Sequence, residues 1–154
     1  MADKPVAVDS GPHQVSRQIV VNAPVAEIFA LVANPHRHPE LDGSGTVRHT
    51  PVTGPERLER GARFSVGMKQ YGFPYKITST VTEFADNQVI EWRHPMGHRW
   101  RWEMASESPT STRVTETFDY SRLKMPKAIE IIGYDKKNAD GIEATLTALS
   151  ARFV

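Results

Sequence analysis

The chain has 154 residues and no cysteine, and its 19 Lys and Arg nearly balance its 18 Asp and Glu. This length fits one domain that can bury a hydrophobic core of its own. The lack of cysteine excludes disulfide frameworks, thiolate nucleophiles and thiolate metal sites. The basic residues are scattered among acidic ones and form no basic stripe, so we expect no nucleic-acid partner.

The N-terminal segment 1–13 is polar and contains Pro and Gly, without the continuous apolar stretch of a signal peptide. No later stretch is apolar enough over the length that a bilayer requires. We therefore expect a flexible N-terminal tail over 1–13, one folded domain over 14–154, a cytoplasmic location and no membrane insertion.

The first expected elements are a strand over 14–22 and a short helix that starts at Pro24. The strand alternates apolar with polar residues, as a strand with one buried face does. Pro24 suits the first helical position, and the apolar residues after it recur with helical spacing. The helix should end at Asn34, because the residue before a proline is displaced from helical backbone angles.

The next stretch, 35–45, is broken by Pro and Gly, which predicts a single helical turn and a tight loop. Residues 46–53 (TVRHTPVT) indicate an edge strand, because Pro51 has no N–H to donate to a neighbouring strand. From Phe64 to Ser121 the chain alternates apolar and polar residues in strands joined by turn sequences such as FADN and ESPTS. This pattern predicts an antiparallel meander with one apolar and one polar face.

The final segment, from about Pro126 to Phe153, changes to a helical period. Its apolar stripe consists of Ile129, Ile132, Ile142, Leu146, Leu149 and Phe153. We expect one long helix with this stripe turned toward the sheet. Gly133 and Gly141 lie inside it, and each costs roughly 1 kcal/mol relative to alanine in a helix. They indicate close packing or a bend.

Four stretches carry a resemblance to a known family: VSRQIVVNAPVAEIFALVANP, HPELDGSGTV, IEWRHPMGHRWRWE and TRVTETFDYS. Together with the order of elements, they resemble the START/Bet v 1-like (SRPBCC, polyketide cyclase/dehydrase-like) superfamily, in its actinobacterial-type branch. The resemblance implies an α+β helix-grip fold, in which a curved seven-stranded antiparallel sheet wraps around a long C-terminal helix, with two short helices after the first strand. It also implies a cavity between sheet and helix for lipids, polyketides or other apolar molecules.

A carboxylate stands among the apolar positions of the last strand. If the last two strands form a hairpin near Pro109, their even-numbered side chains share one face, which places Glu116 beside Trp100 and Trp102. A carboxylate in such surroundings has to be paired, hydrated or protonated. Arg17 is the expected partner, because the first strand lies next to the last in this fold family.

Three interpretations of Arg17 and Glu116 stay open. They can form a structural ion pair, a polar anchor for a ligand oxygen, or the acid–base group of an enzyme in which Tyr120 also takes part. The tryptophans likewise fit core packing or ligand contact. The expected ligand-binding side chains are Phe64, Val66, Met68, Tyr75, Ile77, Ile90, Trp92, Trp100, Trp102, Glu116, Phe118, Ile132 and Ile142, with His38 and Asp42 at the pocket mouth.

The histidines give no metal signature. His36, His38 and Asp42 match no defensible ligand spacing and suit solvated or capping roles, apart from the pocket-mouth position that the family motif suggests for the last two. His94 and His98 flank a turn and can face each other, but the sequence offers no third zinc ligand. We expect no metal and no other cofactor, because nucleotide-binding and nucleophile motifs are also absent from the sequence.

The leading functional hypothesis is binding of a small hydrophobic ligand, apolar or aromatic and lipid- or polyketide-like, in the internal cavity. One alternative is an aromatase/cyclase-like enzyme acting on a polyketide-type substrate. Another is a non-catalytic interaction module or the effector of a regulatory pair. The expected assembly is a monomer or a homodimer, and fold analogy alone does not choose among these functions.

Overall fold

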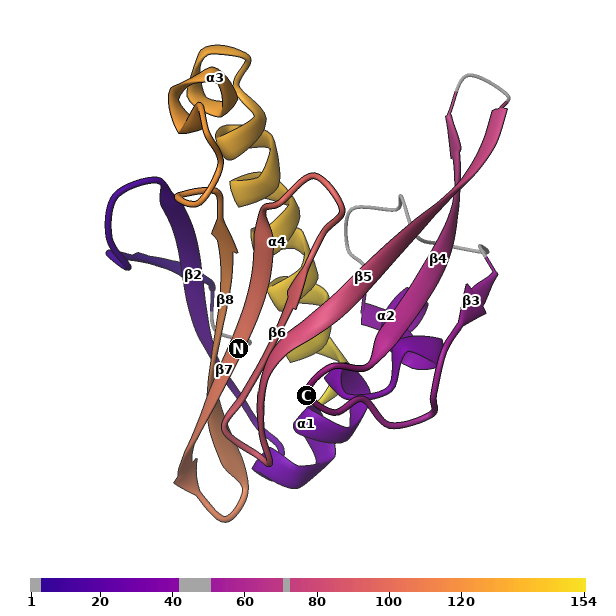
Figure 1. The fold of residues 1–154 in the computed structure, drawn as a ribbon. Helices are drawn as coiled ribbons and strands as arrows, with labels where there is room; N and C mark the ends of the chain where they lie inside the picture. The colour runs from indigo at the N-terminus through magenta and orange to yellow at the C-terminus, as the bar shows by residue number, and fades with distance from the viewer. Residues whose placement is uncertain (1–3, 42–50, 71–72) are drawn as a thin grey trace.

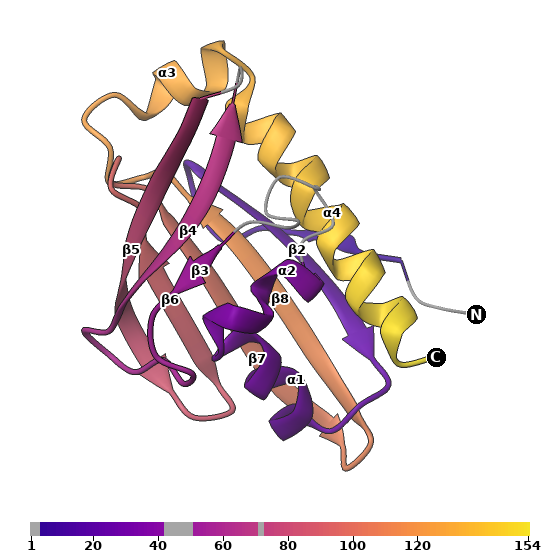
Figure 2. The same cartoon turned by 90° about the vertical axis from the view of Figure 1, so that its right-hand side faces the viewer.

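The computed structural model describes residues 4–41, 51–70 and 73–154, without the side chains of residues 68–70. An antiparallel sheet curves around one long helix, as Figures 1 and 2 show. The strands are β1 (Val6–Val8), β2 (Gln14–Val21), β3 (Val52–Thr53), β4 (Arg63–Gln70), β5 (Phe73–Ala85), β6 (Val89–Arg93), β7 (Arg99–Ser108) and β8 (Ser111–Asp119). The helices are α1 (Val25–Val32), a 3₁₀ turn (Pro35–Arg37), α2 (His38–Leu41), α3 (Pro126–Ile131) and α4 (Tyr134–Arg152).

The sheet has eight strands in the order β1-β2-β8-β7-β6-β5-β4-β3, so the first long strand lies next to the last, as predicted. The α+β helix-grip class is confirmed, with one strand more than the seven expected. The additional strand is β1, which lies within the 1–13 segment expected as a flexible tail and pairs with β2 from Val6 opposite Gln18 to Val8 opposite Ser16. Of the edge strand expected over 46–53, the described part is β3.

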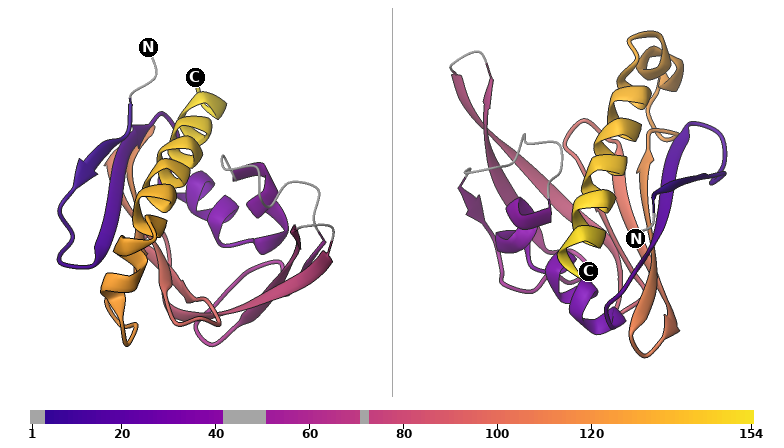
Figure 3. Two further views of the ribbon diagram at one scale, coloured as in Figure 1. Left: turned by 90° about the horizontal axis from the view of Figure 1, so that it is seen from above. Right: turned by 180° about the vertical axis from the view of Figure 1, so that it is seen from behind.

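The core lies between the concave face of the sheet and the helices. Seen from above, α1, α2 and α4 all lie on this one side of the sheet (Figure 3). Ile142, Leu146 and Leu149 of α4 are buried in the same cluster as Val114 and Phe118 of β8. The stripe predicted from helical spacing therefore packs on the core, with Ile129 and Phe153 partly buried against it, because removal of these side chains from water stabilises the fold.

The C-terminal helical segment is interrupted, whereas a single continuous helix was expected. Gly133 has a φ of 75°, in the left-handed region that glycine adopts without the steric cost of a Cβ. The break separates α3 from α4 and leaves Ile132 73% exposed, so this residue lies outside the apolar stripe. Gly141, by contrast, sits within α4 without a break. In the described part of the chain, no helix combines the length and apolar character needed to cross a bilayer.

Candidate functional site on the concave face

The register of the sheet places the predicted aromatic residues on its concave face. Trp100 lies opposite Phe118 and Trp102 opposite Glu116 in the β7–β8 ladder, as parity predicts. Trp92 lies opposite Trp100 in the neighbouring ladder. Since Phe118 and Trp102 belong to the buried core, this face is the one turned toward α4.

Three predicted residues meet at the end of this face near α2. The His38 ring stacks on Trp92 with centroids 5.1 Å apart, and Phe64 meets both rings edge-on at 5.4 Å. The three come from α2, β4 and β6, elements that are distant in sequence. His38, predicted at the pocket mouth, therefore contacts Phe64 and Trp92, two of the predicted ligand-binding residues.

A second aromatic group lies toward α4. Trp100 and His98 contact Phe118 at centroid distances of 5.0 and 5.1 Å, and Tyr134, the first residue of α4, meets the edge of Phe118 at 5.8 Å. The Tyr120 ring also stacks on Phe118, at 5.4 Å. The Trp92–Trp100 pair joins the two groups. We call the joined set the aromatic belt: His38, Phe64, Trp92, His98, Trp100, Phe118, Tyr120 and Tyr134.

The side chains of the belt do not bury one another completely. Phe118 is 0% exposed and Phe64 is 4% exposed, whereas Trp92 and Trp100 remain half-buried. Both tryptophans point to the concave side, from strands that have a neighbour on either edge. Part of each indole surface is therefore accessible beside the core, and an indole is a large apolar platform for another flat molecule.

His38 supplies a neutral polar group to the belt. Burial lowers its pKa from 6.5 to about 4, although the hydrogen bond to Val32 acts in the opposite direction. The ring is thus uncharged at neutral pH. Nε2 lies 2.7 Å from the Val32 carbonyl oxygen, which can only accept, so Nε2 carries the proton and Nδ1 is the acceptor atom of the ring.

His98 lies buried at the other group and is 4% exposed. Burial, together with the neighbouring His94 ring stacked on it at 4.2 Å, lowers its pKa to about 4. The two rings face each other as their positions beside the turn predict. In the ranges that the structure describes, no group of three or more His, Cys, Asp or Glu side chains could hold a metal ion.

Tyr120 is a proton donor at neutral pH and not a base. Burial raises its pKa to about 12, and the nearby charges of Glu130 and Asp135 raise it as well. Glu130 in turn lies 3.6 Å from the His13 ring. A role for Tyr120 in catalysis stays a prediction.

The ion pair expected between Arg17 and Glu116 is replaced by another. The two residues do lie directly opposite each other in the β2–β8 ladder. The Arg17 guanidinium nevertheless donates through Nε to Glu143 of α4, at 2.9 Å. The Glu116 side chain remains 7% exposed, between Arg17 and Trp102 in its row of the sheet. Arg17 therefore fastens α4 to the sheet.

The other predicted ligand-binding residues separate into three sets. Ile90, Trp102 and Ile142 are at most 3% exposed and fill the core. Val66 and Ile77 lie opposite each other in the β4–β5 ladder and are half-buried, so they retain accessible surface. Tyr75 is 41% exposed and, with Ile132, lies outside the buried core. Asp42 and the side chain of Met68 lie outside what the structure describes.

His98 and Tyr134 belong to the belt but were not among the residues predicted for it. His98 has the parity of Trp100 and Trp102, and this signal could have placed it on the same face. Tyr134 had no such signal, because its position depends on the break at Gly133.

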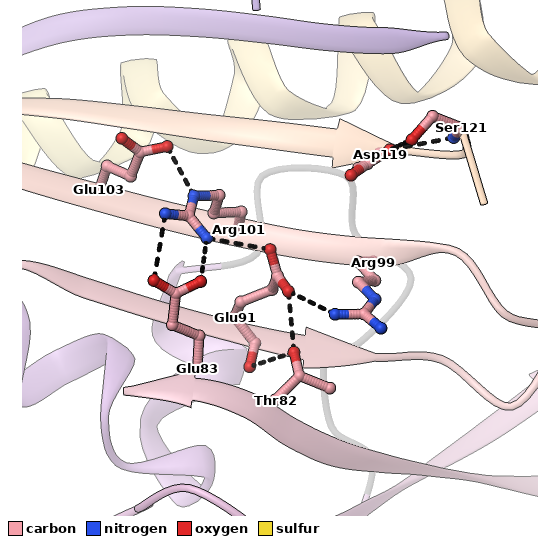
Figure 4. Close-up of polar contacts among 8 residues, drawn as sticks. All are labelled: Thr82, Glu83, Glu91, Arg99, Arg101, Glu103, Asp119 and Ser121. Carbon is pink, nitrogen blue, oxygen red and sulfur yellow. Dashed lines mark hydrogen bonds and ion pairs between the residues drawn. The ribbon is translucent and has the colours of Figure 1, made fainter. Parts of the chain in front are cut away.

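The convex face of the sheet carries a charged network, drawn in Figure 4. Glu91 is only 5% exposed and accepts hydrogen bonds from Arg99, Arg101 and Thr82. Burial alone would raise the pKa of Glu91, but these donors outweigh it and hold the pKa below its usual value. Arg101 also binds Glu83 and Glu103. The network pairs the charges of Glu83, Glu91 and Glu103 with those of Arg99 and Arg101, and a polar hollow of about 440 Å³ lies beside it, lined by Arg101, Glu103 and Thr115 among others.

The family model described as "Polyketide cyclase / dehydrase and lipid transport" matches residues 12–153. Among curated proteins, the uncharacterized protein Rv0088 of Mycobacterium tuberculosis is 55% identical over 150 residues, which cover 95% of this chain and 66% of the relative. The chain thus spans slightly less than two thirds of that relative's length.

Solved structures share the fold at low identity. Protein Ms6760 from Mycobacterium smegmatis has a TM-score of 0.68 at 15% identity, covering 99% of this chain and 97% of that one. A protein from Rhodobacter sphaeroides has a TM-score of 0.73 at 13% identity, with 97% of each chain covered. The di-domain ARO/CYC protein BexL, from the BE-7585A biosynthetic pathway, has a TM-score of 0.68 at 22% identity over 90% of this chain and 45% of its own. With its family model matched from residue 12 to residue 153, this chain belongs to the polyketide cyclase/dehydrase and lipid transport family.

Proposed function

We propose that the protein binds a small apolar or aromatic molecule between the sheet and α4, against the accessible surfaces of Trp92 and Trp100. The observation that carries this proposal is that both indoles remain half-buried on the concave face, whereas Phe64, His98 and Phe118 beside them are buried. A ligand that covers about 300 Å² of apolar surface gains about 7 kcal/mol before association costs, so micromolar affinity requires a good fit and additional polar contacts.

The polar groups at this face suit recognition. His38 offers an uncharged acceptor, Nδ1, beside Trp92, and Glu116 lies in the row next to Trp100. A few polar atoms in an apolar surround orient a ligand without a large desolvation cost. Hydroxyl or carbonyl groups on an otherwise flat aromatic skeleton match this arrangement.

The pKa values of the belt favour binding over proton-transfer catalysis. A general acid or base works best when its pKa is near the working pH. The pKa values of His38 and His98 are about 4 and that of Tyr120 is about 12, so none of these three groups is poised near neutrality. An aromatase/cyclase-like activity, suggested by the fold of BexL, therefore ranks second.

Fluorescence titration with 1-anilinonaphthalene-8-sulfonate and with 2-naphthol tests the proposal. We expect saturable binding at micromolar concentrations, weakened about tenfold or more in Trp92→Ala and Trp100→Ala, because each change removes part of the platform. Trp92→Phe should retain most of the affinity. Met96→Ala, at a position 74% exposed in the β6–β7 turn, is the matched control.

Equal affinity in the wild type and both alanine variants, with unchanged circular dichroism, would refute the assignment of the site. A complete absence of saturable binding would favour the interaction-module alternative. Glu116→Gln separates binder from enzyme: loss of turnover of a supplied poly-β-ketone, with probe binding intact, would show that chemistry occurs at this face.

A further inference from the structure

Large apolar side chains are exposed at one end of the molecule. Among the described residues, the exposed large apolar side chains include Phe73 (75%), Tyr75 (41%), Met96 (74%), Met125 (73%), Ile131 (83%) and Ile132 (73%). They belong to the start of β5, the β6–β7 turn, and α3 with its flanking residues. We call these six residues the end patch. Val6 and Val154, the other two exposed large apolar residues among those described, lie elsewhere in the chain.

The three segments of the end patch occupy the same end of the fold. Figure 1 shows α3, the β6–β7 turn and the β4–β5 hairpin all at the top, with the turn lying between α3 on one side and the hairpin on the other. A Cβ built on Gly97 would lie 3.0 Å from Cδ2 of Leu123, so the β6–β7 turn touches the segment that leads into α3. Exposed apolar residues gathered in this way mark an interaction surface.

The end patch is accompanied by positive charge. Over 121–137 the chain has five basic residues, all exposed, against two acidic ones: Arg122, Lys124, Lys127, Lys136 and Lys137 against Glu130 and Asp135. Glu130 is already beside His13, at 3.6 Å. Lys76 of β5 adds another exposed cation. The nearly balanced chain thus carries a local excess of positive charge beside its exposed apolar residues.

We propose that the end patch docks on the surface of an anionic lipid bilayer. Exposed apolar side chains flanked by lysines are the combination with which peripheral segments enter the interfacial region and reach lipid phosphates. A second copy of this chain fits less well, because an isologous contact would bring the two basic surfaces together. The contact is superficial and needs no spanning helix. It goes beyond the ligand site and does not depend on it.

Vesicle co-sedimentation with the full chain tests this proposal. We expect binding to vesicles of equal parts phosphatidylglycerol and phosphatidylcholine to exceed binding to phosphatidylcholine alone by about tenfold or more, and to weaken with salt. The double change Ile131→Asn and Ile132→Asn should reduce binding about tenfold, as should Lys124→Glu with Lys127→Glu. The matched controls are Val6→Asn with Val154→Asn, and Arg60→Glu, which alter exposed residues outside the patch.

Three results would overturn the proposal: no preference for the anionic vesicles, equal binding by the patch variants and the controls, or a wild-type dimer that only the patch variants abolish in analytical ultracentrifugation while vesicles are not bound. The last result would assign the patch to a homodimer. Probe titration without vesicles keeps the two proposals apart, because the patch variants should bind 2-naphthol as the wild type does.

Discussion

Strand β7 carries tryptophans on its concave side and charged residues on its convex side. On the convex side Arg99 and Arg101 both reach the buried Glu91, at 2.9 and 3.1 Å. On the concave side Trp102 is 3% exposed, but Trp100, two residues away, is only half-buried. Charged side chains therefore pair with one another on the convex face, whereas the concave face leaves apolar surface uncovered. Apolar surface that stays accessible on the concave side indicates where an apolar ligand can gain free energy.

The largest effect on the free energy of unfolding is expected at Phe118, and the adjacent Thr117, on the opposite face of β8, provides the comparison. Phe118→Ala should lower the free energy of unfolding by about 3–5 kcal/mol, since it opens a cavity among fully packed rings. Thr117→Val should cost about 1 kcal/mol, because it removes the hydroxyl 2.6 Å from that of Ser16 but keeps the volume. Urea denaturation measures both. Similar losses for the two variants would contradict the assignment of the core to the concave side.

Acid should destabilise the folded protein, because the buried His98 on the concave face stays neutral where the unfolded chain binds a proton. Between pH 6.5 and about 4 the unfolded chain binds a proton at His98 that the folded protein does not bind. Stability is therefore complete above pH 6.5 and falls on acidification, by about 3 kcal/mol for this group. Denaturation of His98→Phe across this pH range should show a flatter profile. A profile with the wild-type slope would mean that other groups cause the loss.

The convex network should respond to loss of its central charge. Glu91→Gln leaves the partly buried Arg99 and Arg101 without a carboxylate between them, and we expect a loss of about 1–2 kcal/mol in unfolding free energy. Glu103→Gln, whose side chain is 50% exposed, should cost less than about 0.5 kcal/mol. A double-mutant cycle of Glu91→Gln with Arg99→Met should show coupling. Additive effects would mean that the pair contributes little.

The smallest effect is expected where the convex face is open to solvent. Arg113 and Glu107 pair at 2.9 Å, but their side chains are 47% and 41% exposed. Arg113→Ala should therefore change the unfolding free energy by no more than about 0.5 kcal/mol. A thermal melt that shifts by as much as that of Glu91→Gln would remove the distinction between the buried network and exposed pairs.

Residue spacing was sufficient to predict which side chains share a face of the sheet. It was not sufficient to predict which side chains from distant parts of the sequence contact each other. The parity of Trp100 and Phe118 placed both on the concave side, because a strand has a period of two. Arg17 met Glu143, 126 residues away, and that pairing depends on how α4 crosses β2. Strand β1 has only three residues, and so short an apolar run could not be distinguished from a tail.

The site was predicted unevenly for a similar reason. Phe64, Trp92 and Trp100 could be selected because alternation and aromatic character coincide in them. The accessible surface of these residues could not be predicted from the sequence, because it depends on how the helices cover the sheet. Ile132 continued a helical stripe in the sequence, and Gly133 indicated close packing or a bend, but the sequence did not show that the left-handed backbone of Gly133 turns Ile132 out of that stripe.

The break at Gly133 gives the molecule two helical units of unequal stability. None of the residues of α3 is buried, while α4 contributes Ile142, Leu146 and Leu149 to the core. Local opening of α3 breaks its few backbone hydrogen bonds and leaves the core contacts of α4 intact. Amide hydrogens of α3 should thus exchange with solvent well before those of α4, so that this end of the protein can reshape on contact while the rest stays folded.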